Sequence, residues 1–248
     1  LAFLLIKMTG VDREVIEKWL YVIVGLALFS GLLGTGHHYY WIGTPGYWQW
    51  IGSLFSILEV LPFFAMVLWC FHMVYRSGRN HPNKAAMLWS LGCPVLAFFG
   101  AGVWGLMHSF SFVNFYSHGT QITAPHGHMA FYGAYVMLNL AFFTYALPQL
   151  RNVQPYNQIL NMWSFWVMTA SMAFMTFTLT FAGVLQTHLQ RVVGMGYMEI
   201  QQQLDLFYWM RLLAGVVFVI GAILYIYATL GPIKNQITAS ANLQPAGK

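Results

Sequence analysis

Charged residues are the scarcest feature of this 248-residue chain: Asp, Glu, Lys and Arg make up 7% of it, against 58% hydrophobic residues. Because a soluble globular domain typically carries about 25% charged residues, this composition excludes that class. Cysteine is also scarce, with only Cys70 and Cys93. Two thiols outside a short secreted framework predict free side chains in a core rather than a disulfide scaffold.

Long hydrophobic runs fill most of the chain. A membrane-spanning helix needs about 20 apolar residues, whereas transmembrane strands are short and alternate apolar with polar residues. We therefore predict an all-α polytopic membrane protein, with residues 1–248 forming a single transmembrane domain. About six transmembrane helices are expected, roughly over Trp19–Tyr39, Tyr47–Tyr75, Lys84–Met107, Pro125–Leu147, Ile159–Thr187 and Asp205–Leu230.

The two ends of the chain differ from the rest. Leu1 to Met8 is too short to span a bilayer and is typical of the tail of a helix, without the basic region and cleavage site of a signal peptide. We expect a preceding membrane portion in the full protein. The polar residues 234–248 predict a flexible cytoplasmic tail.

Basic residues are unevenly divided between the two sides of the predicted bundle. With alternating spans, nine of the 11 Lys and Arg residues fall on one side, Arg191 falls on the other, and Arg211 lies inside the last span. Cytoplasmic loops carry the excess of Lys and Arg, so both termini are predicted to be cytoplasmic. The net charge of +5 then reflects orientation, and we expect no nucleic-acid partner.

Two histidine pairs stand out against this apolar background, because ionisable residues within spans usually have a functional partner. Pro125 suits the first turn of a helix, which places His126 and His128 at the start of the fourth span. Two helical steps rotate by about 200°, so the two imidazoles are expected on opposite faces, where each could bind a different metal. Two haems flanking one helix fit that geometry, with Gly127 leaving room between them. Alternatively, either ring could simply hydrogen-bond to a neighbouring helix.

The second pair is His37 and His38. Consecutive residues of a regular helix point about 100° apart, so convergence on one metal requires irregular backbone, which the preceding Gly34-Thr35-Gly36 can supply. The following Tyr39, Tyr40 and Trp41 suit the outer membrane interface.

Glu59 is a lone carboxylate inside the apolar stretch 51–67. It could be protonated and merely bridge helices, but a metal ligand or a proton carrier is the favoured interpretation. The histidines nearer the membrane edges favour ordinary roles: His72, His81, His108, His118 and His188. Of these, His118 is retained with Arg191 as a candidate partner of haem propionates, since arginine binds carboxylates well.

These motifs together closely resemble the catalytic subunit of bacterial nitric oxide reductase, a member of the haem-copper oxidase superfamily. The matching segments are Gly34–Gly43 (GTGHHYYWIG), Glu59, His118–Gln121 (HGTQ) and His126–Gly133 (HGHMAFYG). The resemblance covers essentially the whole chain and corresponds to the second half of a twelve-helix subunit.

The resemblance implies a role for each matching residue. His37 and His38 would bind the non-haem iron FeB, His126 the iron of haem b3, and His128 that of the low-spin haem b. Glu59 would be the carboxylate beside the binuclear centre. The remaining FeB ligands and the second haem b ligand lie upstream in the family and are absent from this chain.

The resemblance also implies the reaction and its setting. Two NO molecules, two electrons and two protons would give N2O and water, as in denitrification. We expect cytochrome c as electron donor, a haem c-containing small subunit as partner, and a multi-pass location in the bacterial inner membrane. The site would lie nearer the periplasmic side.

Three other functions are open to this sequence. A quinol-dependent nitric oxide reductase shares the motifs. An oxygen-reducing haem-copper oxidase shares the paired histidines, but its next helix generally carries a lysine or another proton channel, whereas this one carries Glu59. A proton-coupled transporter would use intramembrane His and Glu as a relay, but it predicts internal repeats, which the sequence lacks.

Overall fold

The computed structural model describes residues 1–77, 81–151 and 157–231, and within these residues all regular structure is helical. Six helical segments are long and apolar enough to cross a membrane: 17–39, 47–76, 84–109, 123–150, 158–193 and 205–230. The predicted fold class and the number of spans are thus confirmed. The expected tail at 234–248 lies outside the described residues.

Each span consists of one or more consecutive helices. Regular helices are α1 (Ala2–Thr9), α2 (Arg13–Gly34), α3 (Tyr47–Ser77), α4 (Lys84–Ala97), α5 (Gly105–Ser109), α6 (Ser111–Ser117), α7 (Thr123–Phe131), α8 (Met137–Leu150), α9 (Gln158–His188), α10 (Tyr197–Gln203) and α11 (Asp205–Leu230). A 3₁₀ segment, η1 (Thr35–Tyr39), follows α2. Three π-helical segments are η2 (Phe98–Trp104), η3 (Tyr132–Val136) and η4 (Leu189–Val193).

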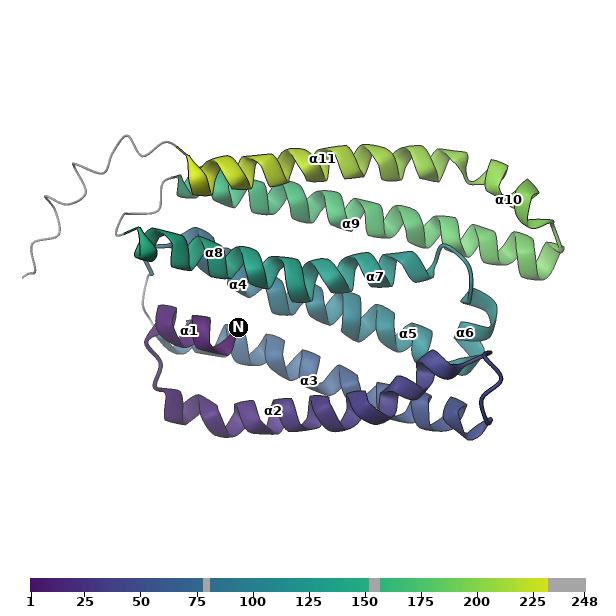
Figure 1. Cartoon of the computed structure of the whole chain (residues 1–248), viewed down its shortest axis with the longest axis horizontal. Helices are drawn as coiled ribbons and strands as arrows, with labels where there is room; N and C mark the ends of the chain where they lie inside the picture. Colours follow the sequence, from purple (N-terminus) through teal and green to yellow (C-terminus); the bar gives the residue numbers. More distant parts are fainter. Residues whose placement is uncertain (78–80, 152–156, 232–248) are drawn as a thin grey trace, which may run out of the picture.

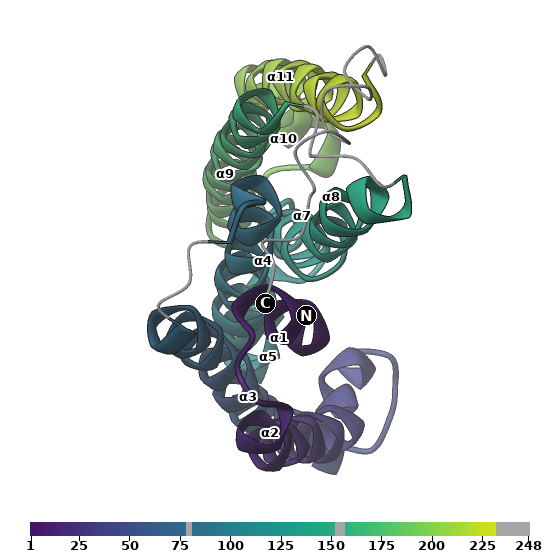
Figure 2. The ribbon, with the colours of Figure 1, turned by 90° about the vertical axis from the view of Figure 1, so that its left-hand side faces the viewer.

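The spans lie side by side and roughly parallel (Figure 1). Seen end-on, they form an open arc, with α2 and α3 at one end and α9 and α11 at the other (Figure 2). Helices α4 and α7 lie in the middle, and short α1 packs against α3 and α4. Large apolar side chains on the outer surfaces, such as Leu32 at 78% exposed, suit contact with lipid or with further transmembrane helices.

Hydrogen bonds inside the bundle join helices whose relative positions apolar packing alone would not fix. The indole of Trp89, which is fully buried, donates to Asn161 Oδ1 at 2.7 Å, and Asn161 Nδ2 donates to Thr229 at 3.2 Å. The Tyr225 hydroxyl lies 3.1 Å from that of Thr144. These bonds link α4, α8, α9 and α11, because a buried polar group in the bilayer must find a protein partner. Cys70 and Cys93 are buried and free in the same core, as predicted.

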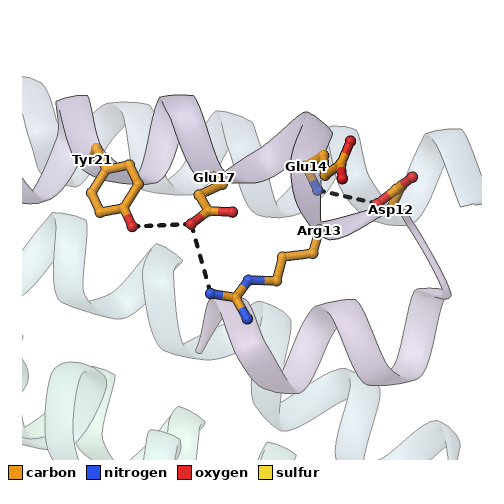
Figure 3. Close-up of polar contacts among 5 residues, drawn as sticks. All are labelled: Asp12, Arg13, Glu14, Glu17 and Tyr21. Carbon is orange, nitrogen blue, oxygen red and sulfur yellow. Dashed lines mark hydrogen bonds and ion pairs between the residues drawn. The ribbon is translucent and has the colours of Figure 1, made fainter.

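The start of α2 lies earlier than the hydrophobic run suggests. Asp12 accepts a hydrogen bond from the Glu14 N–H at 3.1 Å and caps the helix. Glu17 pairs with Arg13 at 3.7 Å and accepts from the Tyr21 hydroxyl at 3.0 Å (Figure 3). This polar first turn extends α2 beyond the predicted Trp19, because capping and i to i+4 pairs favour a helix where hydrophobicity gives no signal.

Candidate functional site

Both histidine motifs lie toward the same end of the bundle, the end that carries η1, α5, α6 and the start of α7 (Figure 1). His37 and His38 lie on η1, where the regular helix gives way to a 3₁₀ turn. Their ring centroids are 4.0 Å apart with an interplanar angle of 39°. The irregular backbone expected after Gly34 is therefore present, and it holds the two imidazoles next to each other.

Ser56 fixes the tautomer of His37. The Ser56 hydroxyl donates to the Gly34 carbonyl at 3.3 Å, so its single proton is used there. Its oxygen then accepts from His37 Nδ1, which lies 2.8 Å away. With Nδ1 protonated, the lone pair of a neutral ring is on Nε2. Nε2 of His37 is thus free to bind a metal, and the hydrogen bond at its second nitrogen is the arrangement typical of histidine ligands.

The position of His37 depends on a close contact between η1 and α3. A Cβ built on Gly36 would lie 3.1 Å from the Gly52 backbone, and a Cβ built on Gly52 would overlap the His37 backbone. Only glycine allows two backbones to approach this closely in a membrane bundle. Tyr40 adds further hydrogen bonds between these helices. Its hydroxyl lies 2.8 Å from the Ser109 carbonyl of α5 and 2.7 Å from the Ser53 hydroxyl of α3.

Burial raises the pKa of the Tyr40 hydroxyl above its usual value. A raised phenol pKa keeps the hydroxyl protonated across the physiological range, so it remains a hydrogen-bond donor. Tyr40 is only 3% exposed. It therefore anchors the end of η1 to α3 and α5 under all ordinary conditions.

Glu59 lies one helical turn below Ser56 on α3 and faces α2. A Cβ built on Gly34 would lie 3.1 Å from the Glu59 carboxyl carbon and would overlap its Oε1, and one on Gly31 would lie 3.7 Å from that oxygen. The missing side chain at Gly34 thus creates the space that the carboxylate fills. Glu59 thus lies beside Gly34, whose carbonyl accepts from Ser56, the residue that also bonds His37.

His126 and His128 lie on opposite sides of α7. His126 Nδ1 lies 2.8 Å from the Gly100 carbonyl of η2, and His128 Nδ1 lies 2.8 Å from the Ala124 carbonyl of its own helix. A carbonyl can only accept, so each Nδ1 is protonated and each Nε2 carries a lone pair. Gly100 belongs to a π segment, whose widened turn interrupts the regular ladder of hydrogen bonds.

His128 faces open apolar space. One groove of about 590 Å³ is lined by His128, Gly127, Phe131 and Met172 among others. A second groove of about 570 Å³ is lined by His128, Met175, Arg211 and several aliphatic residues of α11. Large apolar grooves beside an Nε2 with a free lone pair fit a planar macrocyclic cofactor. On the opposite face, His126 approaches η2 and α5, with Gly105 beside its ring.

His108 is a residue whose place the sequence does not indicate. It is 9% exposed, its ring centroid lies 5.9 Å from that of His126, and Nε2 lies 3.0 Å from the Ile122 carbonyl. Its Nδ1 is buried without a partner among the described residues. The sequence predicts an ordinary role at the outer edge, and only contacts that depend on the folded bundle bring this ring to the site.

The other candidates lie away from these rings. His118 and Arg191 are exposed and contact each other, because Arg191 donates to the His118 carbonyl at 3.3 Å. His72 and His188 are exposed, and His81 accepts from the Asn83 N–H at 3.1 Å. The sequence also indicates no role for Ser56 or for the Gly100 carbonyl, because a single serine or glycine carries no sequence pattern that predicts a contact between helices.

Within the described residues, no three His, Cys, Asp or Glu side chains converge to hold one metal ion. His37 and His38 therefore offer two ligands of a metal site rather than a full set. Each of His126 and His128 has one Nε2 that could bind a metal, and the two face different sides of α7.

A protein-family model, Cytochrome C and Quinol oxidase polypeptide I, matches residues 1–217. The chain belongs to this family. A nitric oxide reductase subunit of Stutzerimonas stutzeri is 55% identical over 236 residues, covering 92% of this chain and 50% of that protein. A cytochrome c oxidase subunit 1 homolog of Agrobacterium tumefaciens is 26% identical over 253 residues, covering 95% of this chain and 46% of that protein.

A solved structure confirms the fold of this family member. A heme-copper terminal oxidase dimer studied by cryo-EM superposes with a TM-score of 0.63 at 18% identity, covering 81% of this chain and 40% of that one. The chain spans about half the length of the curated relatives it matches, and it corresponds to the C-terminal half of the reductase subunit.

Proposed function

We propose that this chain is part of the catalytic subunit of a nitric oxide reductase, which converts two NO molecules, two electrons and two protons to N2O and water. The observation that carries this proposal is the placement of two imidazoles on opposite faces of α7, each with Nδ1 tied to a carbonyl. The 55% identity to a nitric oxide reductase subunit favours this chemistry over that of the more distant oxidase homologs.

The histidines would hold the cofactors. His126 would bind the iron of the high-spin haem b3 and His128 that of the low-spin haem b, each through Nε2. His37 and His38 would bind the non-haem iron FeB, with further ligands from a part of the subunit that this chain does not include. Bound haem and iron supply the redox chemistry. His118 and Arg191 remain candidates for haem propionates at the outer rim.

Glu59 would deliver protons. Its carboxyl lies in the gap at Gly34, between the backbone of α2 and the serine that bonds His37. A carboxyl group in this position can hold a proton and pass it to the space beside the paired histidines. A carboxylate near histidine ligands also suits iron better than copper.

The partners and the location follow from the same proposal. The electron donor would be cytochrome c, acting through a haem c-containing small subunit, in the bacterial inner membrane. Figure 1 shows short α1, the start of α2, the end of α3, the start of α4 and the end of α8 at the end of the bundle opposite η1 and the start of α7. By their positions in these helices, six described basic residues belong to that end: Lys7, Arg13, Lys18, Arg76, Lys84 and Arg151. This charge bias supports a cytoplasmic C-terminus and an active site nearer the periplasm.

The test uses the complete complex with a reduced donor, in the absence of oxygen. We expect NO consumption with N2O as product and only slow use of oxygen. Rapid oxygen reduction without N2O would instead place the protein among the oxidases, and a preparation without haem would support a transporter. A requirement for quinol in place of cytochrome c would correct the donor alone.

Spectroscopy of two variants tests the ligand assignment separately. His128→Ala should remove the low-spin haem signal and leave the high-spin one, because the two rings serve opposite faces of α7. His126→Ala should do the reverse. His72→Ala, at an exposed position on α3, is the control and should keep both signals. An exchange of the two effects would contradict the assignment of the helix faces.

A further inference from the structure

The short helix α5 ends in contact with both histidine motifs. Its last two residues, His108 and Ser109, are buried, and the backbone becomes extended at Phe110. The last carbonyls of a helix have no partner within that helix. The carbonyls at the end of α5 can therefore accept hydrogen bonds from other elements and join them to each other.

The Ser109 carbonyl binds the chain that follows the paired histidines. It lies 2.8 Å from the Tyr40 hydroxyl and 2.7 Å from the Ser53 hydroxyl. A carbonyl oxygen has two lone pairs and can accept from both groups. Through Tyr40, which comes two residues after His38, the end of η1 is thus held to α5.

Trp41 makes a second connection between this chain and α5. Its φ of 64° lies in the left-handed region, which a bulky residue adopts only where the surrounding contacts hold it. Its indole donates to Asn114 Oδ1 at 2.7 Å, and Asn114 Nδ2 donates to the His108 carbonyl at 2.9 Å. Two successive residues after the paired histidines are thus bound to the last two carbonyls of α5, one directly and one through Asn114.

The side chains of α5 contact the other motif. His108 Nε2 donates to the carbonyl of Ile122, the residue before α7, at 3.0 Å. The His108 ring centroid lies 5.9 Å from that of His126. A Cβ built on Gly105, one turn earlier on α5, would lie 3.1 Å from the His126 ring. The helix therefore packs against the His126 ring and is bonded to the start of α7.

The bond to Ile122, rather than the size of the ring, distinguishes His108 from an apolar residue. Since a carbonyl only accepts, Nε2 carries the proton and Nδ1 carries a lone pair. That lone pair has no partner among the described residues, although the side chain is only 9% exposed. A buried polar atom without a partner costs free energy, and a phenylalanine would fill similar space without that cost.

We propose that His108 is a positioning residue, which fixes the His126 ring relative to His37 and His38 through the end of α5. This inference rests on the proposed function, in which these histidines would hold the iron of haem b3 and FeB. Two metal centres can act on the same pair of small molecules only at a fixed separation, because reacting groups must be held in a narrow range of geometry. The bonds at the two sides of α5 would maintain that separation.

The test follows the magnetic coupling between the two irons in the oxidised, intact complex by EPR spectroscopy. Exchange coupling between two ferric ions weakens steeply as they move apart, so displaced centres give the signal of an uncoupled high-spin haem. We expect this signal in His108→Phe, which keeps a ring but loses the bond to Ile122, while haem and non-haem iron contents match the wild type. His108→Gln should restore the coupled state, because its amide can donate to the same carbonyl.

Two further variants complete the experiment. Tyr40→Phe removes the hydroxyl that bonds Ser109 and should also produce the uncoupled signal. Combined with His108→Phe it should add little, because both changes break the same connection. His81→Phe is the matched control. It removes a histidine that accepts from a backbone N–H at 3.1 Å, just before α4 at the opposite end of the bundle, and it should keep the coupled state.

Three results would overturn the inference: a fully coupled state in His108→Phe, equal loss of coupling in His108→Phe and His108→Gln, or additive losses in the double variant. If His108→Phe does not retain haem, a fully coupled Tyr40→Phe overturns it instead. A wild-type complex without haem, without non-haem iron or without NO turnover would contradict the proposed function itself, which is a different failure.

Discussion

Single residues determine which atoms of the site are available to a metal. Ser56 illustrates this, since its hydroxyl donates its proton to Gly34 and so accepts from His37 Nδ1. Removing such an orienting partner of a metal ligand typically costs about 10-fold to 100-fold in metal affinity or activity.

We expect Ser56→Ala to lower the non-haem iron content and NO turnover by about 10-fold to 100-fold, while both haems stay bound. Iron analysis and the optical spectrum of the purified complex provide the measurement. Ser30→Ala is the matched control, because Ser30 is equally buried but bonds to the Leu26 carbonyl of its own helix at 2.7 Å. Full iron occupancy in Ser56→Ala would argue against a ligand role for His37.

Glu59→Gln keeps the size and the hydrogen-bonding capacity of the side chain but removes its ability to carry a proton. We expect loss of NO turnover with both haem signals intact, because the residue is proposed to transfer protons rather than to bind haem. Glu17→Gln, on the polar first turn of α2, should behave like the wild type. Full activity of Glu59→Gln would contradict the proposed role.

At the scale of elements, the site depends on how closely η1 approaches α3. Gly52→Ala would place a Cβ onto the His37 backbone. Since overpacking typically costs about 1–3 kcal/mol, we expect a lower denaturation temperature and a partial loss of non-haem iron. Thermal unfolding in detergent and metal analysis test this.

Gly25→Ala provides the comparison for that variant, because a Cβ at Gly25 has no neighbour within 4 Å. Alanine is favoured over glycine inside a helix by about 1 kcal/mol, so this change should be neutral or slightly stabilising. Equal destabilisation by both changes would mean that the contact with η1 does not explain the effect of Gly52→Ala.

The elements differ in how readily the sequence predicts them. The long apolar runs predict the six spans, and α3 begins at Tyr47 as expected. The ends of α2 and the π segments could not be predicted, because caps and widened turns have little effect on hydrophobicity. The irregular backbone at His37 was predictable from Gly34 and Gly36, whereas the burial of His108 beside His126 depends on contacts between distant helices.

For the whole molecule, the distribution of charge predicts how the bundle sits in the membrane. We expect Met198→Cys, at a position 74% exposed on α10, to react with a membrane-impermeant maleimide added to spheroplasts. Arg151→Cys, at the other end, should react only after the membrane is permeabilised. The native Cys70 and Cys93 are buried and give a low background. The opposite labelling pattern would reverse the proposed orientation.

The placement of His126 and His128 on one short stretch of α7 would also matter for electron transfer between the two proposed haems. Electron-transfer rates depend steeply on the distance between the two redox centres, and distances between separate helices change as the helices of a bundle move. Two ligands separated by a single residue of one helix are spaced by covalent geometry, about 3 Å apart along the axis. A movement of α7 would therefore carry both centres together, so the rate of transfer between them would tolerate differences in lipid, temperature and pressure that alter helix packing.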